Sequence, residues 1–436
     1  MKNDSTGGAP PPAAVCPVVH FDHHSPEHAL DPWAVYRQMR DTCPVIESDA
    51  YGGFKVVTSY KNVTAVAQDW ATFSSAHDAD GTGNGYGGVT IPSAPLRSIP
   101  VETDPPEHTR YRRLLTPLFT QAEVDRRRAR IEEIAQHFVD QVIEAGACDL
   151  VNDIAVPTPA AFTLDLLGIP VERWERYAVP MHQIVYAPQD TPEYAEAVEG
   201  TAWILEDVAR ELAARRAGGG EGDDLLSHLL RVEIDGARLE EQTILEIAWL
   251  VIVGGLDNTA SLLANAFLWL YQNPHQRERL RGDDELTESA FDEFLRYFTV
   301  TQALSRTATK DTAIEGYPIR AGERVFIVWA AANRDPEFFD RPEEVVLERS
   351  PNRHVGFGWG PHRCIGALVA KEMFRTALQA VLTRMPDYTI DESQVRSYPS
   401  VGIACGFIGM PATFTPGARR SPLSANTVQL SHNGVV

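Results

Sequence analysis

The sequence predicts a mainly α-helical fold with a minor β content, and three observations lead to that prediction. Long segments repeat apolar residues at helical spacing, several begin at a capping residue, and strand-like runs are few and short. The longest segment, residues 239–272, continues without a break to Asn273-Pro274. At about 1.5 Å per residue, such a helix is roughly 50 Å long, the width of a whole domain. We therefore expect one long central helix inside a helical domain.

The other elements follow in chain order. Asp31-Pro32, a capping residue followed by proline, predicts a helix over residues 33–40. Short apolar runs predict strands at 54–58, 312–315 and 324–328, and helical periodicity predicts helices at 122–143, 160–167, 194–216, 224–232, 285–297 and 367–384. Both chain ends carry few apolar residues. We expect one domain over residues 20–416, with flexible tails at 1–19 and 417–436.

Composition excludes several classes of protein. Apolar residues make up 44% and charged residues 23%, as in ordinary globular proteins, and the net charge is −21. Such an acidic surface repels phosphate and anionic lipid, so we expect no nucleic-acid or membrane partner. The longest unbroken apolar run of the central helix, residues 247–256, is too short to span a bilayer. Five scattered cysteines and the lack of a signal peptide predict a cytoplasmic protein.

Two motifs are weak. Residues 83–88 match G-x-G-x-x-G, but no strand precedes them and two prolines follow, so we reject a nucleotide site and expect a long mobile loop over residues 76–100. Four histidines, His20, His23, His24 and His28, could bind a metal ion. They lie beside the tail without a frame of carboxylates, so we expect them to be solvated or to cap helices.

The segment over residues 357–366, FGWGPHRCIG, places one cysteine among three glycines and just before a helix. Glycines let backbone N–H groups approach a sulfur, and the positive end of the helix faces it. Both effects favour a thiolate at Cys364. Three readings remain open from the residues alone: a nucleophile with His362 as its base, a metal ligand, or a buried structural cysteine.

This segment matches F-G-x-G-x-H-x-C-x-G at all six fixed positions, and so resembles the haem-binding signature of the cytochrome P450 family. The resemblance implies the P450 fold, with haem b (iron protoporphyrin IX) between the long central helix and the Cys-ligand loop. It implies that Cys364 is the iron ligand, and that Phe357 and Gly366 lie beside the haem. A thiolate ligand favours O–O cleavage.

Other segments resemble the same family. Glu293 and Arg296 match its E-x-x-R pair, and Arg349 matches the third charged residue that braces the cysteine loop. Haem carries two propionates, which attract cations. Residues 104–112 resemble D-P-P-x-H-x-x-x-R, which implies that His108 and Arg112 contact a propionate. Two further propionate contacts are implied at the residues that match them, Arg306 and His354.

The long helix carries Gly254-Gly255-Leu256-Asp257-Asn258-Thr259, which resembles the family pattern A/G-G-x-D/E-T-T/S. The resemblance makes Asp257 the acid of the proton-delivery pair. Asn258 stands where the family usually has a catalytic threonine. An amide can donate and accept hydrogen bonds but has no hydroxyl. We therefore expect Asn258 to hold a water molecule or a polar group of the substrate.

The implied function is a monooxygenase that hydroxylates, or otherwise oxidises, a small hydrophobic molecule with O2 and two electrons. The chain has no flavin or iron–sulfur segment, so we expect a ferredoxin, with its reductase and NAD(P)H, to supply electrons. Expected pocket walls are residues 91–99, 249–258, 300–304 and 403–407. The expected ferredoxin surface is the basic set Arg110, Arg112, Arg113, Arg126, Arg127, Arg128, Arg130, Arg363 and Lys371.

Two alternatives stay open. The first is a haem-thiolate enzyme that does not insert oxygen from O2, such as a peroxygenase, dehydratase or isomerase. Asn258 keeps this alternative open, whereas Asp257 speaks against it, because proton delivery is useful mainly for O–O cleavage. The second is a non-catalytic haem-binding or gas-sensing protein, against which the lack of a signalling or DNA-binding segment speaks.

Overall fold

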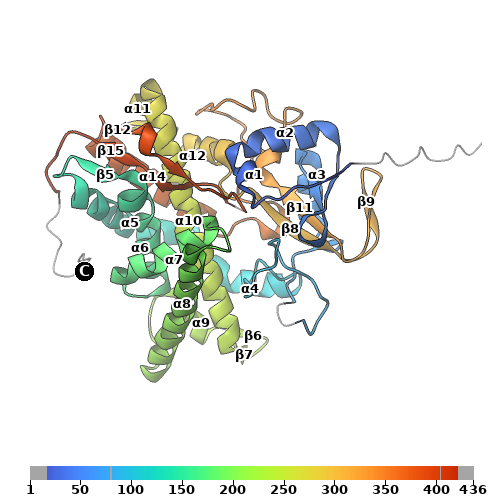
Figure 1. Ribbon diagram of the computed structural model, residues 1–436. Coiled ribbons are helices and arrows are strands. Elements are labelled where there is room, and N and C mark those ends of the chain that lie inside the picture. The colour runs from blue at the N-terminus through green and yellow to red at the C-terminus, as the bar shows by residue number, and fades with distance from the viewer. Residues whose placement is uncertain (1–16, 79–80, 403, 421–436) are drawn as a thin grey trace, which may run out of the picture.

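A computed structural model describes residues 17–78, 81–402 and 404–420, and its helices surround one long central helix, α10 (Figure 1). The helices are α1 (Pro26–Leu30), α2 (Pro32–Thr42), α3 (Tyr60–Gln68), α4 (Glu107–Leu115), α5 (Gln121–Val142), α6 (Pro157–Leu167), α7 (Trp174–Tyr186), α8 (Pro192–Ala217), α9 (Leu225–Arg231), α10 (Glu241–Gln272), α11 (Pro274–Leu280), α12 (Asp284–Phe298), α13 (Trp329–Ala332) and α14 (Ala367–Arg384).

The strands are short and lie mostly in one sheet of order β1-β2-β3-β11-β8-β4. Its centre pairs β11 with β3 in parallel and with β8 in antiparallel, so that Phe326 lies opposite Val56 and Ser305. The strands are β1 (Val18–Val19), β2 (Ile46–Ser48), β3 (Phe54–Val57), β4 (Phe73–Ser74), β5 (Ala147–Asp149), β6 (Glu233–Ile234), β7 (Ala237–Arg238), β8 (Ala303–Ala308), β9 (Thr312–Ile314), β10 (Tyr317–Ile319), β11 (Arg324–Val328), β12 (Thr389–Ile390), β13 (Arg396–Ser397), β14 (Phe407–Gly409) and β15 (Pro411–Thr413). The predicted fold class, mainly α with minor β, is confirmed.

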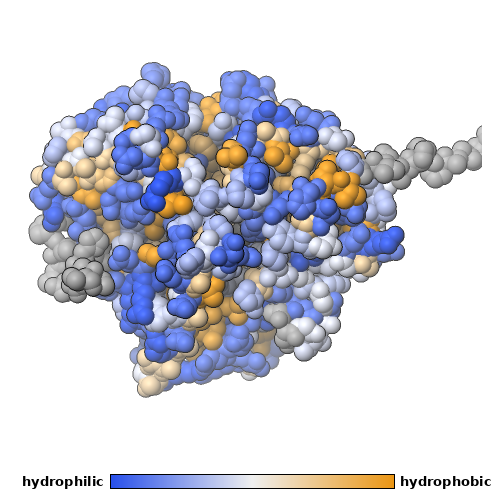
Figure 2. All heavy atoms as spheres, in the orientation of Figure 1, coloured by the Kyte–Doolittle hydropathy of each residue, from blue (hydrophilic) through white to orange (hydrophobic). Residues whose placement is uncertain are grey.

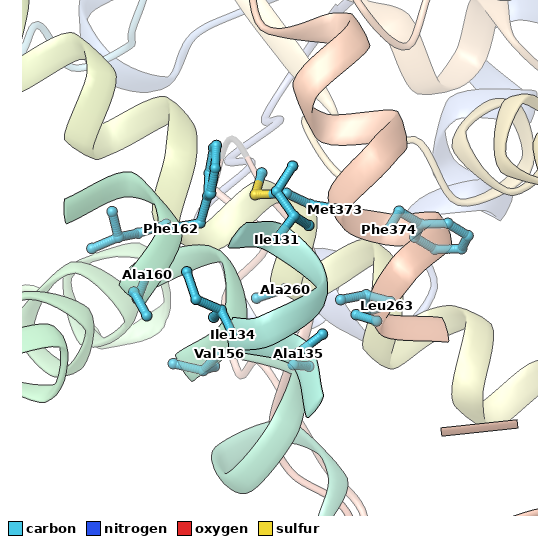
Figure 3. Packing of buried hydrophobic residues seen from close by; sticks show 14 of the residues in the cluster. Ile131, Ile134, Ala135, Val156, Ala160, Phe162, Ala260, Leu263, Met373 and Phe374 are labelled. Atoms are coloured by element: carbon cyan, nitrogen blue, oxygen red, sulfur yellow. The ribbon is translucent and has the colours of Figure 1, made fainter. Parts of the chain in front are cut away.

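The main core lies where α5, α6, α10 and α14 meet. Figure 3 shows Ile131 of α5, Phe162 of α6, Leu263 of α10 and Phe374 of α14 in one cluster. Helix α10 is long and apolar enough to cross a membrane, but 61% of its most apolar window is buried inside the protein. Its apolar character therefore reflects burial among other helices, as expected. On the outer face in Figure 2, apolar side chains are scattered among polar ones.

The boundaries of the predicted elements hold to within a few residues, but six helices, α1, α3, α4, α7, α11 and α13, are not in the predicted list. Helix α14 and strand β11 have the predicted bounds, whereas α7 was not predicted. Residues 18–19 form a strand, and residue 417 donates its backbone N–H to Ile143 at 2.9 Å, so the ordered part is longer than 20–416 at both ends. The rest of the predicted tails, residues 1–16 and 421–436, lies outside the described residues.

The histidine prediction is wrong for two of the four residues. His23 and His28 are buried, with Nε2 atoms 2.8 Å from the Ile91 carbonyl oxygen and 3.1 Å from the Tyr36 hydroxyl. Burial holds the pKa of His23 at about 3 and that of His28 at about 4. Within the described residues, no group of His, Cys, Asp or Glu side chains could hold a metal ion. These histidines are core residues of the first sheet.

The loop after β4 has no strand–helix context, as expected. Its described residues are tied by the Asp78 carboxylate, which accepts the backbone N–H groups of Gly83 and Gly85 at 2.8 and 2.6 Å. Of the cysteines, Cys148, Cys364 and Cys405 are free thiols, whereas Cys43 is disulfide-bonded.

Candidate functional site

The cysteine loop is a tight turn that ends at α14. Gly358 and Gly360 have φ values of +72° and +68°, a left-handed backbone that favours glycine. A Cβ on Gly360 would also lie 2.8 Å from the Ala67 carbonyl oxygen. The loop closes through the Cys364 backbone N–H, which donates to the Phe357 carbonyl at 2.8 Å. The glycines therefore serve a fixed turn that holds Cys364 just before the helix.

Cys364 is an accessible residue, although its sulfur lies deep in the protein. Burial raises the pKa of this thiol, against the opposing effects of the Gly366 backbone N–H and of the Arg112 and Arg363 charges. The loop alone therefore does not favour the thiolate that the sequence led us to expect. A metal ion bound to the sulfur would remove the proton outright.

A buried charged cluster braces the loop from behind. Arg296 pairs with Glu293 through two bonds of 2.8 Å, and Arg349 donates to the same carboxylate at 2.9 Å. The remaining Arg296 donors reach the carbonyl oxygens of Asn333, Pro342 and Glu344 at 2.7–2.9 Å. This cluster fastens α12 to residues 333–349, which precede the cysteine loop. The arrangement is the brace that the resemblance implies.

A second cluster, made of arginine and histidine side chains, lies on the Cys364 side of the loop. The His108 and His362 rings lie 4.3 Å apart, centroid to centroid. Burial and the charges of Arg306, His108 and Arg112 lower the pKa of His362 to about 2. Arg306 is 2% exposed, and burial lowers its pKa to about 10. Four side chains thus converge beside the thiol: His108 and Arg112 of α4, Arg306 of β8 and His362 of the cysteine loop.

The polar atoms of this second cluster lack partners. Both ring nitrogens of His108 and of His362 are buried without a hydrogen bond among the described residues. Arg306 donates only to the Ser305 carbonyl at 2.7 Å, and Arg112 only to the Arg363 carbonyl. A buried charge without a counter-charge is costly. Two carboxylates placed here would satisfy these groups, so the residues fit the propionates of a haem whose iron binds Cys364.

The structure changes one residue of the predicted set. His354 lies with its Nε2 atom 3.5 Å from the Asp292 carboxylate of α12, and its Nδ1 accepts the Gly356 N–H at 3.2 Å. The His354 ring therefore contacts α12, and both of its nitrogens already have a partner. His362 occupies the cationic cluster instead. The signature itself contains His362, but the sequence argument considered this residue only as a base for a nucleophile.

The two adjacent glycines of α10 have different structural roles. A Cβ on Gly255 would lie 2.5 Å from Thr163 Oγ1 of α6, so this glycine permits the close approach of the two helices. A Cβ on Gly254 would meet no atom within 4 Å, and Gly254 is exposed in the middle of a core helix. Open space therefore adjoins α10 at Gly254. Glycine lowers the stability of a helix, and the lack of a side chain at this position leaves room for a ligand.

Asp257 and Asn258 follow on different faces of α10. Asp257 is 6% exposed, and its Oδ1 lies 2.7 Å from His182 Nδ1 of α7 and 3.0 Å from the Tyr398 hydroxyl. Asn258 Oδ1 accepts the Thr301 hydroxyl at 2.8 Å, and its Nδ2 lies 3.4 Å from the Gly254 carbonyl. The acid is thus held in a network, whereas the amide keeps donor capacity on the Gly254 side. Sequence reasoning did not find His182 or Tyr398.

Comparisons with known proteins agree with this geometry. A family model described as Cytochrome P450 matches residues 174–396. The chain is 33% identical to cytochrome P450 monooxygenase PikC of Streptomyces venezuelae, over 86% of this chain and 89% of that protein. It is 29% identical to the steroid C26-monooxygenase of Mycobacterium tuberculosis (strain ATCC 25618 / H37Rv), over 88% of this chain and 94% of that protein.

A solved structure gives the same result. The Mycobacterium marinum cytochrome P450 CYP268A2 in complex with pseudoionone superposes with a TM-score of 0.82 at 29% identity, covering 92% of this chain and all of that one. Fold, cysteine loop and relatives therefore agree, and the cluster beside Cys364 fits the propionates of the haem that the family carries. The chain belongs to the cytochrome P450 family and is a monooxygenase of that family.

Proposed function

We propose that this enzyme hydroxylates, or otherwise oxidises, a small hydrophobic molecule with O2 and two electrons from a ferredoxin. The observation that carries the proposal is the accessible Cys364 thiol beside Arg306 and the unpartnered buried ring nitrogens of His108 and His362. Haem held by a thiolate supplies the oxygen-activating chemistry. Cys364 would bind the iron, and Phe357 and Gly366 flank the sulfur. The propionates would be held by the charges of Arg112 and Arg306 and by hydrogen bonds from the His108 and His362 rings.

Residues of α10 supply proton control and orientation. Asp257 is buried and hydrogen-bonded, so its carboxylate stays in place while it accepts and releases a proton. Asn258 donates one amide N–H to the Gly254 carbonyl and accepts the Thr301 hydroxyl, so its second N–H is left for water or a polar substrate group. We expect Asn258→Ala to form less product per NAD(P)H than wild type, and Asn258→Thr to retain most of it. Full coupling in the alanine variant would remove any role for the amide.

The ligand assignment is tested by a difference spectrum of the reduced, carbon-monoxide-bound protein. We expect a thiolate-type band that Cys364→Ala abolishes and that the matched control Cys148→Ala retains, because Cys148 is a free thiol on β5, outside the cysteine loop. We also expect one iron per chain and no flavin or acid-labile sulfide. A thiolate band that survives in Cys364→Ala would refute the assignment.

The substrate is proposed to be hydrophobic because the expected walls are apolar. Ile91 and Ile99 are buried, and Val300 packs in the core beside Thr301; residue 403 of the fourth predicted wall lies outside the described residues. Relatives named for a steroid and for polyketide biosynthesis support this class. A screen for substrate-induced spectral shifts, with steroid and polyketide ligands against polar sugars, tests it.

Ferredoxin docking is proposed on the face of α4 and the cysteine loop. Most of the predicted basic set pairs with acids: Arg126 with Glu123 and Asp223, and Lys371 with Glu288 and Asp292. Arg112, Arg113 and Arg363 pair with no carboxylate in the described part of the chain. A cleft of about 310 Å³ lies there, lined by His108, Thr109, Arg112, Arg113, Thr116 and Pro361. Arg113 and Arg363, which are not assigned to a propionate, are free to meet an acidic partner.

The docking proposal predicts a salt-dependent rate of reduction by ferredoxin. Arg113→Glu should lower that rate, whereas the matched control Arg126→Glu should not, because Arg126 already pairs with two acids. A rate that does not change with salt contradicts the proposal. We place the enzyme in the cytoplasm, where such a donor and NAD(P)H are found, and cell fractionation tests this.

The alternative function is haem-thiolate chemistry without insertion of oxygen from O2. The buried hydrogen bonds of Asp257 favour the monooxygenase, because a positioned acid serves O–O cleavage. Product formed with peroxide but not with O2 and a reductase would favour the alternative.

A further inference from the structure

The Asp257 carboxylate joins three segments that are far apart in the sequence. His182 comes from α7 and lies 75 positions away, and Tyr398 follows β13 and lies 141 positions away. Asp257 Oδ2 also lies 3.4 Å from the Ser261 hydroxyl, one turn along α10. One side chain therefore links α7, α10 and the segment 396–409.

The protonation of this cluster follows from its contacts. A carboxylate oxygen only accepts hydrogen bonds, so His182 Nδ1 carries a proton toward Asp257 Oδ1. Burial and the Asp257 charge raise the pKa of Tyr398 well above its usual value, so its hydroxyl stays protonated and donates to the same oxygen. His182 Nε2 is buried and has no partner among the described residues.

The surroundings offer no other counter-charge. Within the described ranges, no lysine or arginine pairs with Asp257. Tyr186 packs beside both rings, but its hydroxyl donates to Glu193 of α8 at 2.8 Å. Cys405, the other titratable group beside Tyr398, stays neutral because burial raises its pKa to about 12. His182 and Tyr398 are thus the two groups from other segments that hold this carboxylate.

The segment 396–409 comes close to α10 at this point. Tyr398 donates its backbone N–H to the Gly406 carbonyl at 3.1 Å, and a Cβ on Gly406 would lie 2.5 Å from Ser261 Oγ and 2.8 Å from the Tyr398 ring. His182, Asp257 and Tyr398 are at most 8% exposed. A carboxylate at this depth needs its hydrogen bonds, so separating any segment would expose or strand the acid.

We infer that His182 and Tyr398 are positioning residues for Asp257, and that the three side chains form a latch. This inference rests on the proposed function, in which Asp257 manages protons for the reaction. The latch keeps Asp257 in its delivery position only while α7, α10 and residues 396–409 stay together.

The test compares His182→Ala, His182→Asn and Tyr398→Phe with the matched control Tyr186→Phe. Asparagine places an N–H near the position of His182 Nδ1, and phenylalanine removes only a hydroxyl. Product per NAD(P)H should fall about fivefold in His182→Ala and in Tyr398→Phe, the factor that corresponds to one net hydrogen bond. His182→Asn should restore most of the coupling, and Tyr186→Phe should leave it unchanged.

A second readout does not depend on turnover. Amide hydrogen exchange should rise both in α7 and in residues 396–402 and 404–409 when either His182→Ala or Tyr398→Phe breaks the latch. Coupling within twofold of wild type in both variants would overturn the inference, as would exchange that rises only in the mutated segment. If wild type itself forms no product with O2 and reductase, the proposed function fails, and the exchange result still decides the latch.

Discussion

Two buried arginines, Arg296 and Arg306, lie ten positions apart and have opposite surroundings. Arg296 is 0% exposed, bonds twice to Glu293 and reaches three backbone carbonyls. Arg306 is 2% exposed, and among the described residues its side chain bonds only to the Ser305 carbonyl. The difference shows that burial alone does not give a charged residue its role. A satisfied charge belongs to the scaffold, and an unsatisfied one points to a missing anion.

The largest effect should come from Arg296→Met. The change leaves Glu293 buried with fewer donors and leaves three carbonyls unpaired, so apoprotein stability should fall by about 3–5 kcal/mol. Thermal and denaturant unfolding of the apoprotein measure this. Arg341→Met is a control, because Arg341 is exposed and should change stability little. Equal stability of the Arg296 and Arg341 variants would show that the buried bonds of Arg296 do not stabilise the scaffold.

Arg306→Met should have the reverse pattern. Removing an unpaired buried charge should leave the apoprotein at least as stable as wild type. The holoprotein should lose haem about ten- to a hundredfold faster, because a charge-assisted bond to a propionate is lost. Transfer of haem to an acceptor apoprotein gives the rate. An apoprotein destabilised as strongly as the Arg296 variant would show that Arg306 is scaffold.

His362 and His354 differ in the same way as Arg306 and Arg296, and we expect smaller effects on haem loss from their substitution. His362→Leu should raise the rate of haem loss about fivefold, since one neutral hydrogen bond is lost. His354→Leu should leave haem retention unchanged, because its ring pairs with Asp292. The same transfer measurement decides between them, and the reverse order would restore His354 as the propionate contact.

The smallest effect concerns pH. Burial and the Arg112 charge lower the pKa of His108 to about 4, below its ordinary value of 6.5. Between these values the unfolded chain binds a proton that the folded chain does not, so stability falls as the pH is lowered from 6.5 toward 4. His108→Phe should make this fall shallower in the apoprotein, by less than about 1 kcal/mol between pH 7 and pH 6.

Denaturant unfolding of wild type and His108→Phe at several pH values provides the check. In the holoprotein the two curves should converge, because a propionate beside His108 favours the charged form and removes the difference in proton uptake. Curves that stay equally separated with and without haem would show that His108 meets no anion.

Much of the fold follows from local patterns. Helices α10 and α14 carry long periodic apolar faces and clear ends, so their bounds were predicted to within two residues. Helix α7 was missed because Pro180 interrupts its pattern, although Tyr177, Ala178 and Met181 carry the buried face. Strand β8 was missed because its middle is polar: Ser305 and Arg306 are buried for reasons that lie outside the strand.

The site was predictable where one short segment carries it, as at Cys364. The choice between His354 and His362 depends on where a tight turn points each ring, which spacing does not give. The partners of Asp257 depend on packing of α7 and residues 396–409 onto α10. A histidine in a helix and a tyrosine near the chain end carry no signal of their own until the fold brings them together.

The two adjacent glycines of α10 differ in whether they can accept a side chain. The Thr163 side chain occupies the space beside Gly255, so a side chain there must displace Thr163 or move α10 away from α6. Gly254 has no neighbour within 4 Å of a Cβ. Substitutions of increasing size at Gly254 should therefore narrow the range of substrates without disturbing the fold.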